Sequence, residues 1–223
     1  MSIAAENSAA LPLSDRGGTD MAEKSFPSYE YEKAAAACGF TCVCGIDEAG
    51  RGPLAGPVFA AAVVLPPDCE IPGLNDSKKL TEKKREELFE IITEKAEAYS
   101  VASASEKEID EINILNATFL AMRRAYEGLP VRPDKALIDG NKKPGLPCAE
   151  ETVVKGDSKS MSIAAASILA KVSRDRYMLE MAKLYPQYRF EQHKGYGTKL
   201  HYEMIREHGI SEIHRKTFLK TIH

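Results

Sequence analysis

The stretch VCGIDEAGRGPLAGPV, residues 43–58, decides which fold the sequence predicts. Its apolar opening is typical of a buried strand, and the glycines that follow are typical of a turn. Two acids, Asp47 and Glu48, stand side by side where that strand should end. A buried strand rarely ends in two acids without a partner, so this junction predicts a functional site.

Strand-like and helix-like segments alternate along the rest of the chain. Ser28 and Thr81 are N-cap candidates, Gly128 ends one helix, and Pro186 ends a long one. A tight turn over 193–198 and short amphipathic helices complete the chain. The predicted strands cover residues 42–47, 58–65, 99–104, 135–141 and 151–157, and the predicted helices cover residues 28–37, 81–98, 112–128 and 158–185. This alternation predicts an α/β layered domain.

The composition is that of a globular protein, with 223 residues of which 43% are hydrophobic and 28% charged. No apolar run approaches the ~20 residues of a membrane span, and no secretory signal is recognisable. We therefore expect no membrane association and a cytoplasmic location.

Five cysteines, an odd number, favour reduced thiols. Cys38, Cys42 and Cys44 lie together, but a structural zinc site needs four ligands and every histidine lies from His193 onward.

The charge is unevenly distributed around a net value of −3. Residues 171–223 hold 11 Lys and Arg against 6 Asp and Glu, a balance of +5. The remaining 19 basic and 27 acidic side chains give residues 1–170 a balance of −8. The basic end could dock a polyanion, although charge alone favours an ordinary solvated surface.

Three aspartates, Asp47, Asp139 and Asp157, stand at the ends of predicted strands. Sites in α/β sheets gather where strands exit into loops, so these side chains can converge. Local sequence offers other roles, because Asp139–Gly140 favours a turn and Asp157 equally suits a helix N-cap. Glu48 can join Asp47 at one site only if the chain has already begun to turn there, since neighbours in a strand point to opposite faces.

Crowded carboxylates repel one another and favour protonation, which a divalent cation relieves. Oxygen ligands without nearby His or Cys favour magnesium or manganese over zinc. Two such ions about 4 Å apart can activate a water and stabilise the leaving oxygen in phosphodiester cleavage. The acids therefore favour a magnesium or manganese site, and phosphodiester cleavage is one reaction that such a site can perform.

Several long motifs in the same order resemble the bacterial ribonuclease HII family. They are GIDEAGRGPLAGPV, NDSKKL, IDEINILNATFLAM, ALIDGN, KGDSKSMSIAAASILAKVSRD and HKGYGT, which lie between residues 45 and 198. The resemblance as a whole covers residues 30 to about 216. The resemblance implies a ribonuclease H-like three-layer α/β fold, in which helices flank a mixed five-stranded sheet, with a helical C-terminal part. It implies a catalytic domain over 27–185 and a basic C-terminal part over 186–223 that contacts substrate. Residues 1–26 lie outside the resemblance; they are rich in Ala, Ser, Gly and Asp and show no sustained period, which predicts a disordered leader.

The resemblance also implies an activity. Such an endonuclease hydrolyses the RNA strand of RNA–DNA hybrids and cuts on the 5′ side of ribonucleotides embedded in duplex DNA. It leaves a 3′-hydroxyl and a 5′-phosphate, and it uses Mn²⁺ or Mg²⁺. The implied partners are these nucleic acids, and we expect a monomer.

Carried over residue by residue, the resemblance assigns roles to the motif positions. The implied catalytic and metal-binding carboxylates are Asp47, Glu48, Asp139 and Asp157. The implied ribose-sensing residues are Gly50, Arg51, Gly52 and Tyr196, of which the tyrosine packs on the adjacent deoxyribose. Bare glycine backbone lets peptide groups approach a sugar, and a 2′-hydroxyl both donates and accepts hydrogen bonds.

Phosphate contacts are expected from two places. Ser158 and Lys159 open the long predicted helix, whose N-terminal N–H groups favour a phosphate, although ordinary capping is the alternative. Lys78 and Lys79 lie in a loop and can reach the phosphate backbone.

Two other functions compete with the nuclease. They are a duplex-binding protein that does not cut, which the four acids disfavour, and an integrase-like enzyme, which the glycine–arginine motif disfavours.

Overall fold

The computed structural model describes residues 26–219. The predicted leader lies outside the described residues, apart from Phe26. Within the described range, no helix has both the length and the apolar character needed to cross a membrane.

The fold is built on a mixed five-stranded sheet with the order β3-β2-β1-β4-β5, which confirms the predicted fold class. β1 pairs antiparallel with β2, and β2 pairs antiparallel with β3, whereas β1–β4 and β4–β5 are parallel. The strands are β1 (Val43–Ala49), β2 (Val58–Val64), β3 (Ala98–Ala104), β4 (Lys135–Asp139) and β5 (Ala149–Val153). Because β1, β4 and β5 run the same way, their carboxyl ends lie at one edge of the sheet.

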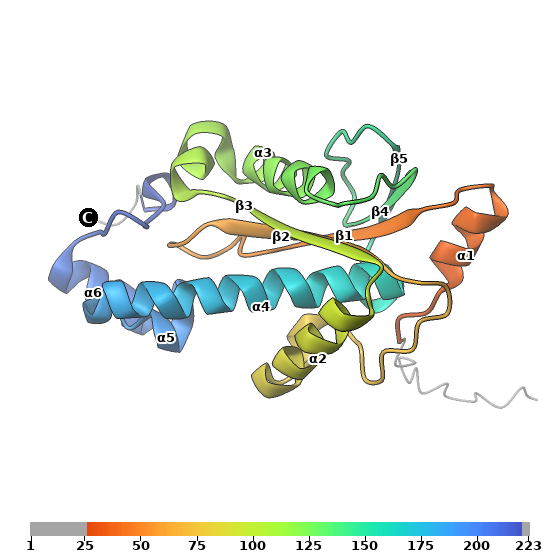
Figure 1. The fold of residues 1–223 in the computed structure, drawn as a ribbon. Coiled ribbons are helices and arrows are strands. Elements are labelled where there is room, and N and C mark those ends of the chain that lie inside the picture. Colours follow the sequence, from red (N-terminus) through yellow and green to blue (C-terminus); the bar gives the residue numbers. More distant parts are fainter. Residues whose placement is uncertain (1–25, 220–223) are drawn as a thin grey trace, which may run out of the picture.

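Helices cover both faces of the sheet (Figure 1). α3 (Glu106–Glu127) packs on one face, and α4 (Met161–Leu184) with α2 (Glu82–Lys95) packs on the other. Alternate residues of β1 face the two layers, so Ile46 belongs to the α3 core and Gly45 lies against α4. A Cβ on Gly45 would lie 2.1 Å from the Ser162 carbonyl carbon, so this glycine allows α4 to approach the strand closely.

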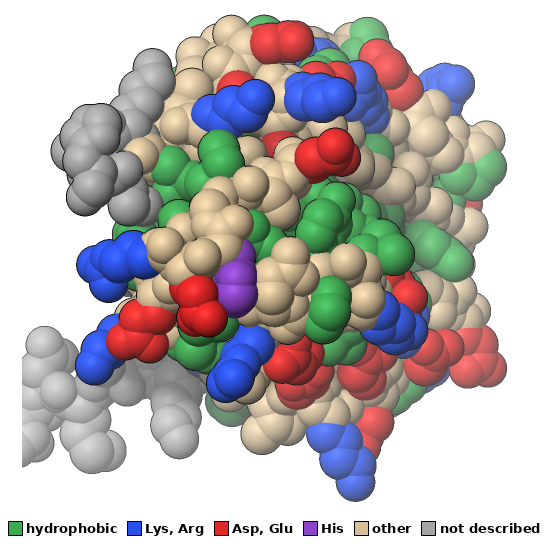
Figure 2. Space-filling view, turned by 90° about the vertical axis from the view of Figure 1, so that its left-hand side faces the viewer, with side chains coloured by type: hydrophobic (Ala, Val, Ile, Leu, Met, Phe, Trp, Pro, Cys, Tyr) green, Lys and Arg blue, Asp and Glu red, His purple; other side chains and the backbone are tan. Residues whose placement is uncertain are grey.

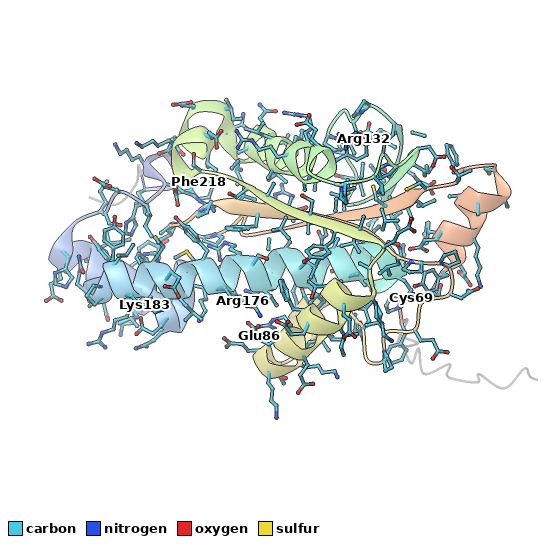
Figure 3. All side chains as sticks on the ribbon, in the orientation of Figure 1. Cys69, Glu86, Arg132, Arg176, Lys183 and Phe218 are labelled. Atoms are coloured by element: carbon cyan, nitrogen blue, oxygen red, sulfur yellow. The ribbon has the colours of Figure 1, made fainter. Side chains whose placement is uncertain are left out.

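α2 is fastened to α4 at its outer side. The Arg176 guanidinium of α4 donates to the Glu86 carboxylate of α2, and both side chains are labelled in Figure 3. The same guanidinium lies 4.2 Å from the centre of the Phe89 ring. This pairing is largely solvent-exposed and orients α2 more than it stabilises the protein.

The C-terminal part packs around the far end of α4. It contains α5 (Phe190–His193), α6 (Lys199–His208) and short 3₁₀ turns, while α1 (Glu30–Ala37) lies at the opposite end of the molecule (Figure 1). A separate small core joins it to the chain after β1, formed by Leu54, Ala55, Met178, Tyr188, Phe190, Ile205, Ile213 and Leu219. Figure 2 shows acidic and basic side chains mixed over this end of the molecule, so the positive charge does not form one patch on this face.

Two predicted helix boundaries were wrong. The helix after Thr81 ends at Lys95, because residues from Ala98 onward pair with β2. α3 begins earlier than predicted, with Ser105 as N-cap in a capping box, and positive φ (67°) at Asn113 bends it where the prediction placed its start. The sequence predicted only the part of α3 that follows this bend.

Three further boundaries were wrong, one near the start of the chain and two before α4. α1 begins at Glu30 with Tyr29 as its N-cap residue, although the Ser28 hydroxyl still accepts from the Glu30 N–H at 3.4 Å. The strand predicted over 151–157 ends at Val153, and a 3₁₀ turn over Gly156–Ser158 follows. α4 therefore starts at Met161, after its N-cap residue Ser160.

Candidate active site

The predicted acids meet at the carboxyl edge of the sheet. Asp139 is the last residue of β4, Asp47 lies in the neighbouring β1, and Asp157 lies in the 3₁₀ turn after β5. The condition set for Glu48 is not met by the backbone, because β1 continues through it to Ala49, which still pairs with β2. The turn therefore begins later than expected.

Asp47 and Glu48 consequently point to opposite faces of the sheet. Asp47 is almost fully buried on the α4 side, where Ser167 hydrogen-bonds to it. Glu48 lies on the α3 side, in a groove that also contains Thr118, Phe119 and Asp139. A second groove, on the side of Lys78 and Asp157, also includes Asp139. Asp139 is thus common to both grooves.

The carboxylates raise one another's pKa values. Burial raises the pKa of Asp47 well above its usual range, and Glu48 and Asp139 add to the effect. Burial also raises the pKa of Glu48, against the opposing charge of Arg51. For Asp157, burial and then Asp139 raise the pKa. The site therefore has a deficit of positive charge, which a bound cation would correct.

Two backbone N–H groups orient the acids. The Glu48 N–H donates to Asp47 Oδ1 at 2.7 Å, and the Gly156 N–H donates to Asp139 Oδ1 at 2.7 Å. Gly156 follows Lys155, whose positive φ (57°) turns the chain back toward β4. The turn after β5 thus fixes the Asp139 carboxylate while it presents Asp157.

Lys78 is the lysine that faces these acids most directly. Its Nζ lies 3.8 Å from Asp157 Oδ2, and its side chain is 80% exposed. Partial burial alone would lower the Lys78 pKa, but Asp157 and Asp47 outweigh it, and the pKa is raised. The Asp76 carboxylate accepts from the Lys78 N–H at 2.9 Å and lies 3.8 Å from Lys79 Nζ, so it holds both lysines at the rim of the groove.

The donor chemistry fits a hard divalent cation. The four acids supply only oxygen ligands, the type that magnesium and manganese prefer. Within residues 26–219, however, no three His, Cys, Asp or Glu side chains are arranged to hold a metal ion. Asp47 and Glu48 point to opposite faces of the sheet, and Asp139 is the acid shared by the grooves on the two sides. All five cysteines are free thiols.

The glycine turn after β1 contains two different kinds of glycine. Gly50 has a φ of +95°, and a Cβ there would lie 2.1 Å from Arg174 Nε, so packing within the protein requires this glycine. A Cβ on Gly52 would meet nothing within 4 Å. Arg51 is half exposed, and its Nη1 donates to Glu48 Oε1 at 3.3 Å. Only Gly52 borders open space that a ligand can occupy.

Tyr196 lies beside this turn, although 140 residues separate them in sequence. Its side chain is 41% exposed, and its ring centre lies 5.6 Å from the Arg174 guanidinium carbon and 5.8 Å from Lys171 Nζ. The Leu54 N–H donates to the Gly195 carbonyl oxygen at 2.8 Å, which joins the two segments. The structure therefore brings together all the residues to which the resemblance gave a ribose-sensing role.

The start of the long helix is occupied by a carboxylate of the protein itself, where the sequence predicted phosphate contacts. The Glu32 carboxylate of α1 already binds that terminus, because its Oε1 accepts from Ser160 Oγ at 2.6 Å and from the Ser162 N–H at 2.9 Å. Ser158 donates its hydroxyl to the Lys155 carbonyl oxygen at 2.9 Å, and Lys159 belongs to the turn before α4. Ser158 does line the groove of Asp157, together with Lys78 and Lys79.

Sequence reasoning missed two buried arginines, Arg174 and Arg215, which bind carbonyl oxygens of the glycine turn. Arg174 stands four residues from the buried Ala170 and Met178, so it occupies a core position of the helical repeat. That placement was a usable signal. Arg215 lies in an irregular segment, and no pattern in the sequence indicates its burial.

The comparisons with known proteins agree with this geometry. The family model for ribonuclease HII matches residues 44–221. A ribonuclease HII from Endomicrobium trichonymphae is 65% identical over 81% of this chain and 86% of its own length. One from Caldicellulosiruptor bescii is 58% identical over 87% of this chain and 94% of its own length. The crystal structure of the ribonuclease H2 from Pyrococcus horikoshii superposes with a TM-score of 0.67 at 30% identity, covering 79% of this chain and 93% of that one.

A carboxylate-lined edge on this mixed sheet defines an enzyme of the ribonuclease H class, which acts on RNA–DNA hybrids with the help of a divalent metal ion. Within that class, the matched region and the identities are specific. The chain belongs to the ribonuclease HII family.

Proposed function

We propose that this endonuclease, besides hydrolysing the RNA strand of hybrids, cuts on the 5′ side of single ribonucleotides embedded in duplex DNA and leaves a 3′-hydroxyl and a 5′-phosphate. The observation that carries the proposal is the position of Asp139. It belongs both to the groove of Glu48 and Arg51 and to the groove of Lys78 and Asp157. A nucleic-acid strand bound across Asp139 would lie beside the acids and also beside the glycine turn.

The proposed roles follow from the contacts. Mn²⁺ or Mg²⁺, when bound, supplies Lewis-acid activation of water and stabilisation of the leaving oxygen. The proposed ligands are Asp47, Glu48, Asp139 and Asp157. Gly156 keeps Asp139 oriented, as its N–H occupies one carboxylate oxygen and leaves the other for a ligand. Lys78 and Lys79, at the rim of the groove, are placed to contact backbone phosphates.

The proposed ribose recognition lies next to the acids. Gly52 borders open space, and the exposed Tyr196 ring stands beside the same turn. Peptide groups at Arg51 and Gly52 can approach a ribose closely and bind its 2′-hydroxyl, which deoxyribose lacks. The tyrosine ring supplies a flat surface for the neighbouring sugar.

The test is cleavage of a duplex that carries one ribonucleotide, compared with an RNA–DNA hybrid and an all-DNA duplex of the same sequence, with and without manganese. Asp47→Asn keeps the size of the side chain but removes a charged ligand. We expect its cleavage to fall by several orders of magnitude, with a matching loss of the manganese-binding heat in calorimetry. Near-wild-type turnover of this variant at saturating manganese would refute the assignment of the acids.

The expected monomeric state and cytoplasmic location remain predictions. Light scattering coupled to size-exclusion chromatography tests the first, and fractionation of cells tests the second.

A further inference from the structure

A single side chain, Arg215, holds three carbonyl oxygens of the glycine turn. Its Nη2 donates to Gly50 O at 2.6 Å, its Nη1 to Arg51 O at 2.9 Å, and its Nε to Gly56 O at 2.8 Å. Its own backbone N–H donates to the Leu54 carbonyl oxygen at 2.8 Å. Only a guanidinium presents donors in a rigid fork that can serve three separate acceptors, so lysine is not equivalent here.

Burial of this arginine is costly. Arg215 is fully buried, and burial, with the nearby positive charge of Arg174, lowers its pKa to about 9. Arg174 is also fully buried, and Glu106 is the carboxylate whose charge acts on both guanidinium groups. Buried charges of this kind are poor sources of stability compared with apolar side chains of similar volume. The two arginines therefore contribute mainly through their directional bonds, which fix the conformation of the glycine turn.

The three bonds determine which way the peptide groups of the turn face. A trans peptide is planar, and its C=O and N–H groups point in opposite directions. Because Arg215 draws the carbonyl groups of Gly50 and Arg51 inward, the N–H groups of Arg51 and Gly52 must point outward. Neither N–H donates a hydrogen bond to any group within residues 26–219. Two adjacent outward donors thus border the open space beside Gly52.

We propose that Arg215 is a positioning residue for ribose selection, which fixes the N–H groups of Arg51 and Gly52 so that they can bind a 2′-hydroxyl. This inference rests on the proposed ribose recognition and adds the residue that enforces it. Arg215 itself lies beneath the turn and does not touch the substrate. Phe218, labelled in Figure 3, covers it, with the ring centre 5.2 Å from the guanidinium carbon.

The structure offers a second way to disturb Arg215 without changing it. The Asp110 carboxylate of α3 accepts hydrogen bonds from the N–H groups of Lys216 and Thr217, both at 2.9 Å, and from the Thr217 hydroxyl at 2.6 Å. These bonds hold the segment that follows Arg215. Because Asp110 is not part of the buried core, the Asp110→Ala variant should fold. It should nevertheless release Lys216 and Thr217, and so hold Arg215 less firmly.

Asp134 supplies a matched control at the opposite edge of the sheet. Its carboxylate accepts from the Thr41 N–H and hydroxyl, both at 2.8 Å, and from the Cys42 N–H at 3.0 Å. It precedes β4, whereas the candidate active-site acids lie at the carboxyl ends of the strands or beyond them. Asp134→Ala therefore removes a matching set of three hydrogen bonds, two from N–H groups and one from a hydroxyl, without reaching the glycine turn.

The experiment measures the Kd of the full chain for a duplex with one ribonucleotide and for the all-DNA duplex of the same sequence, by fluorescence anisotropy in EDTA. The wild type should prefer the ribonucleotide duplex. Arg215→Lys should reduce that preference about tenfold, the scale of one or two lost hydrogen bonds, with the Kd for all-DNA duplex nearly unchanged. Asp110→Ala should reduce it several-fold, and Asp134→Ala should leave it intact.

The outcomes separate the two levels of the argument. If the wild type shows no preference, the proposed ribose recognition is wrong. If the wild type shows the preference and folded Arg215→Lys keeps it, or weakens both complexes equally, the positioning role is overturned. Should circular dichroism show that Arg215→Lys is unfolded, the comparison of Asp110→Ala with Asp134→Ala decides, and equal preferences in those two variants would overturn the role.

Discussion

Acid should destabilise this protein through a pair of buried histidines in its C-terminal part. His201 and His214 are both buried, and their Nε2 atoms lie 3.1 Å apart. His214 Nδ1 accepts from the Ser211 N–H, so its Nε2 carries the proton and donates to His201. His201 then donates from Nδ1 to the Tyr196 carbonyl oxygen at 2.9 Å. The complete chain requires neutral rings, because protonation of His201 removes the acceptor between the rings and protonation of His214 removes the acceptor for Ser211.

The magnitude follows from the pKa values. Burial lowers the pKa of His201 and of His214 to about 4, with a further contribution from the neighbouring histidines. Both values lie below the ~6.5 of an unfolded histidine, so the unfolded state binds more protons, and stability present at pH 7.5 is lost as the pH falls from about 6.5 toward 4. At pH 5 the loss is about 2 kcal/mol for each ring, or about 4 kcal/mol for the pair. A typical domain has only about 5–15 kcal/mol in total.

Other groups near the pair and in the active site also titrate, so the test must isolate these two rings. His193 stacks on His201 with ring centres 4.3 Å apart, and burial lowers its pKa as well. Asp47, Glu48 and Asp157 act in the opposite direction, because their raised pKa values favour the folded state as the pH falls.

The assay is therefore urea unfolding of the wild type and of His214→Asn at pH 7.5 and pH 5. Asparagine keeps an acceptor for the Ser211 N–H but cannot be protonated. The loss of stability between the two pH values should be about 2 kcal/mol smaller in the variant. Tyr188→Phe, which removes a hydroxyl bond to Gly209 in the same core, should lose as much as the wild type. Identical pH dependence in His214→Asn and the wild type would refute the reasoning.

Three further predictions concern the turn, the tyrosine and the sheet. Tyr196→Ala should lower kcat/KM on the single-ribonucleotide duplex by an amount that corresponds to about 1–3 kcal/mol of lost transition-state stabilisation. Tyr196→Phe should lose much less, and equal losses in the two variants would point to a role for the hydroxyl. Gly52→Ala should cleave poorly yet unfold at the wild-type temperature because its Cβ enters open space, while Gly50→Ala should unfold earlier because its Cβ meets Arg174; equal melting temperatures would contradict this difference. Gly45→Ala should lose about 1–3 kcal/mol or more in urea unfolding, since its Cβ would collide with the backbone of α4, and wild-type stability would show that the helix can move away.

The sequence was sufficient to predict the layers and the position of the acids. Apolar runs that end in Asp47 and Asp139 predicted strands with acids at their ends, and parallel pairing of β1 with β4 brings these two together. The local alternative for Asp157 was wrong, because Ser160 is the N-cap of α4. Local pattern could not decide this, since both residues are good caps and only the Glu32 contact from α1 shows where the helix starts.

Other features of the site depend on contacts between distant segments. The turn expected at Glu48 was displaced because pairing of Ala49 with Phe59 extends β1 beyond the acids. The bond between Arg215 and Gly50 joins residues 165 positions apart, and no local preference encodes it. Periodicity reports which face of an element is buried, but it does not report which carbonyl oxygens a buried guanidinium will find.

In the proposed function, catalysis and ribose selection therefore depend on different parts of the chain. Asp47, Glu48 and Asp139 belong to strands of the sheet, and Asp157 lies in the turn after β5, whose Gly156 N–H binds Asp139. The conformation of the glycine turn depends instead on Arg174 of α4 and on Arg215 of the C-terminal part, so residues outside the sheet govern how the turn is presented. A substitution in the C-terminal part should then change the preference between ribose and deoxyribose while the acids keep their arrangement. Conversely, Asp47→Asn should abolish cleavage and leave that preference in binding intact, because none of the contacts that orient the turn passes through Asp47.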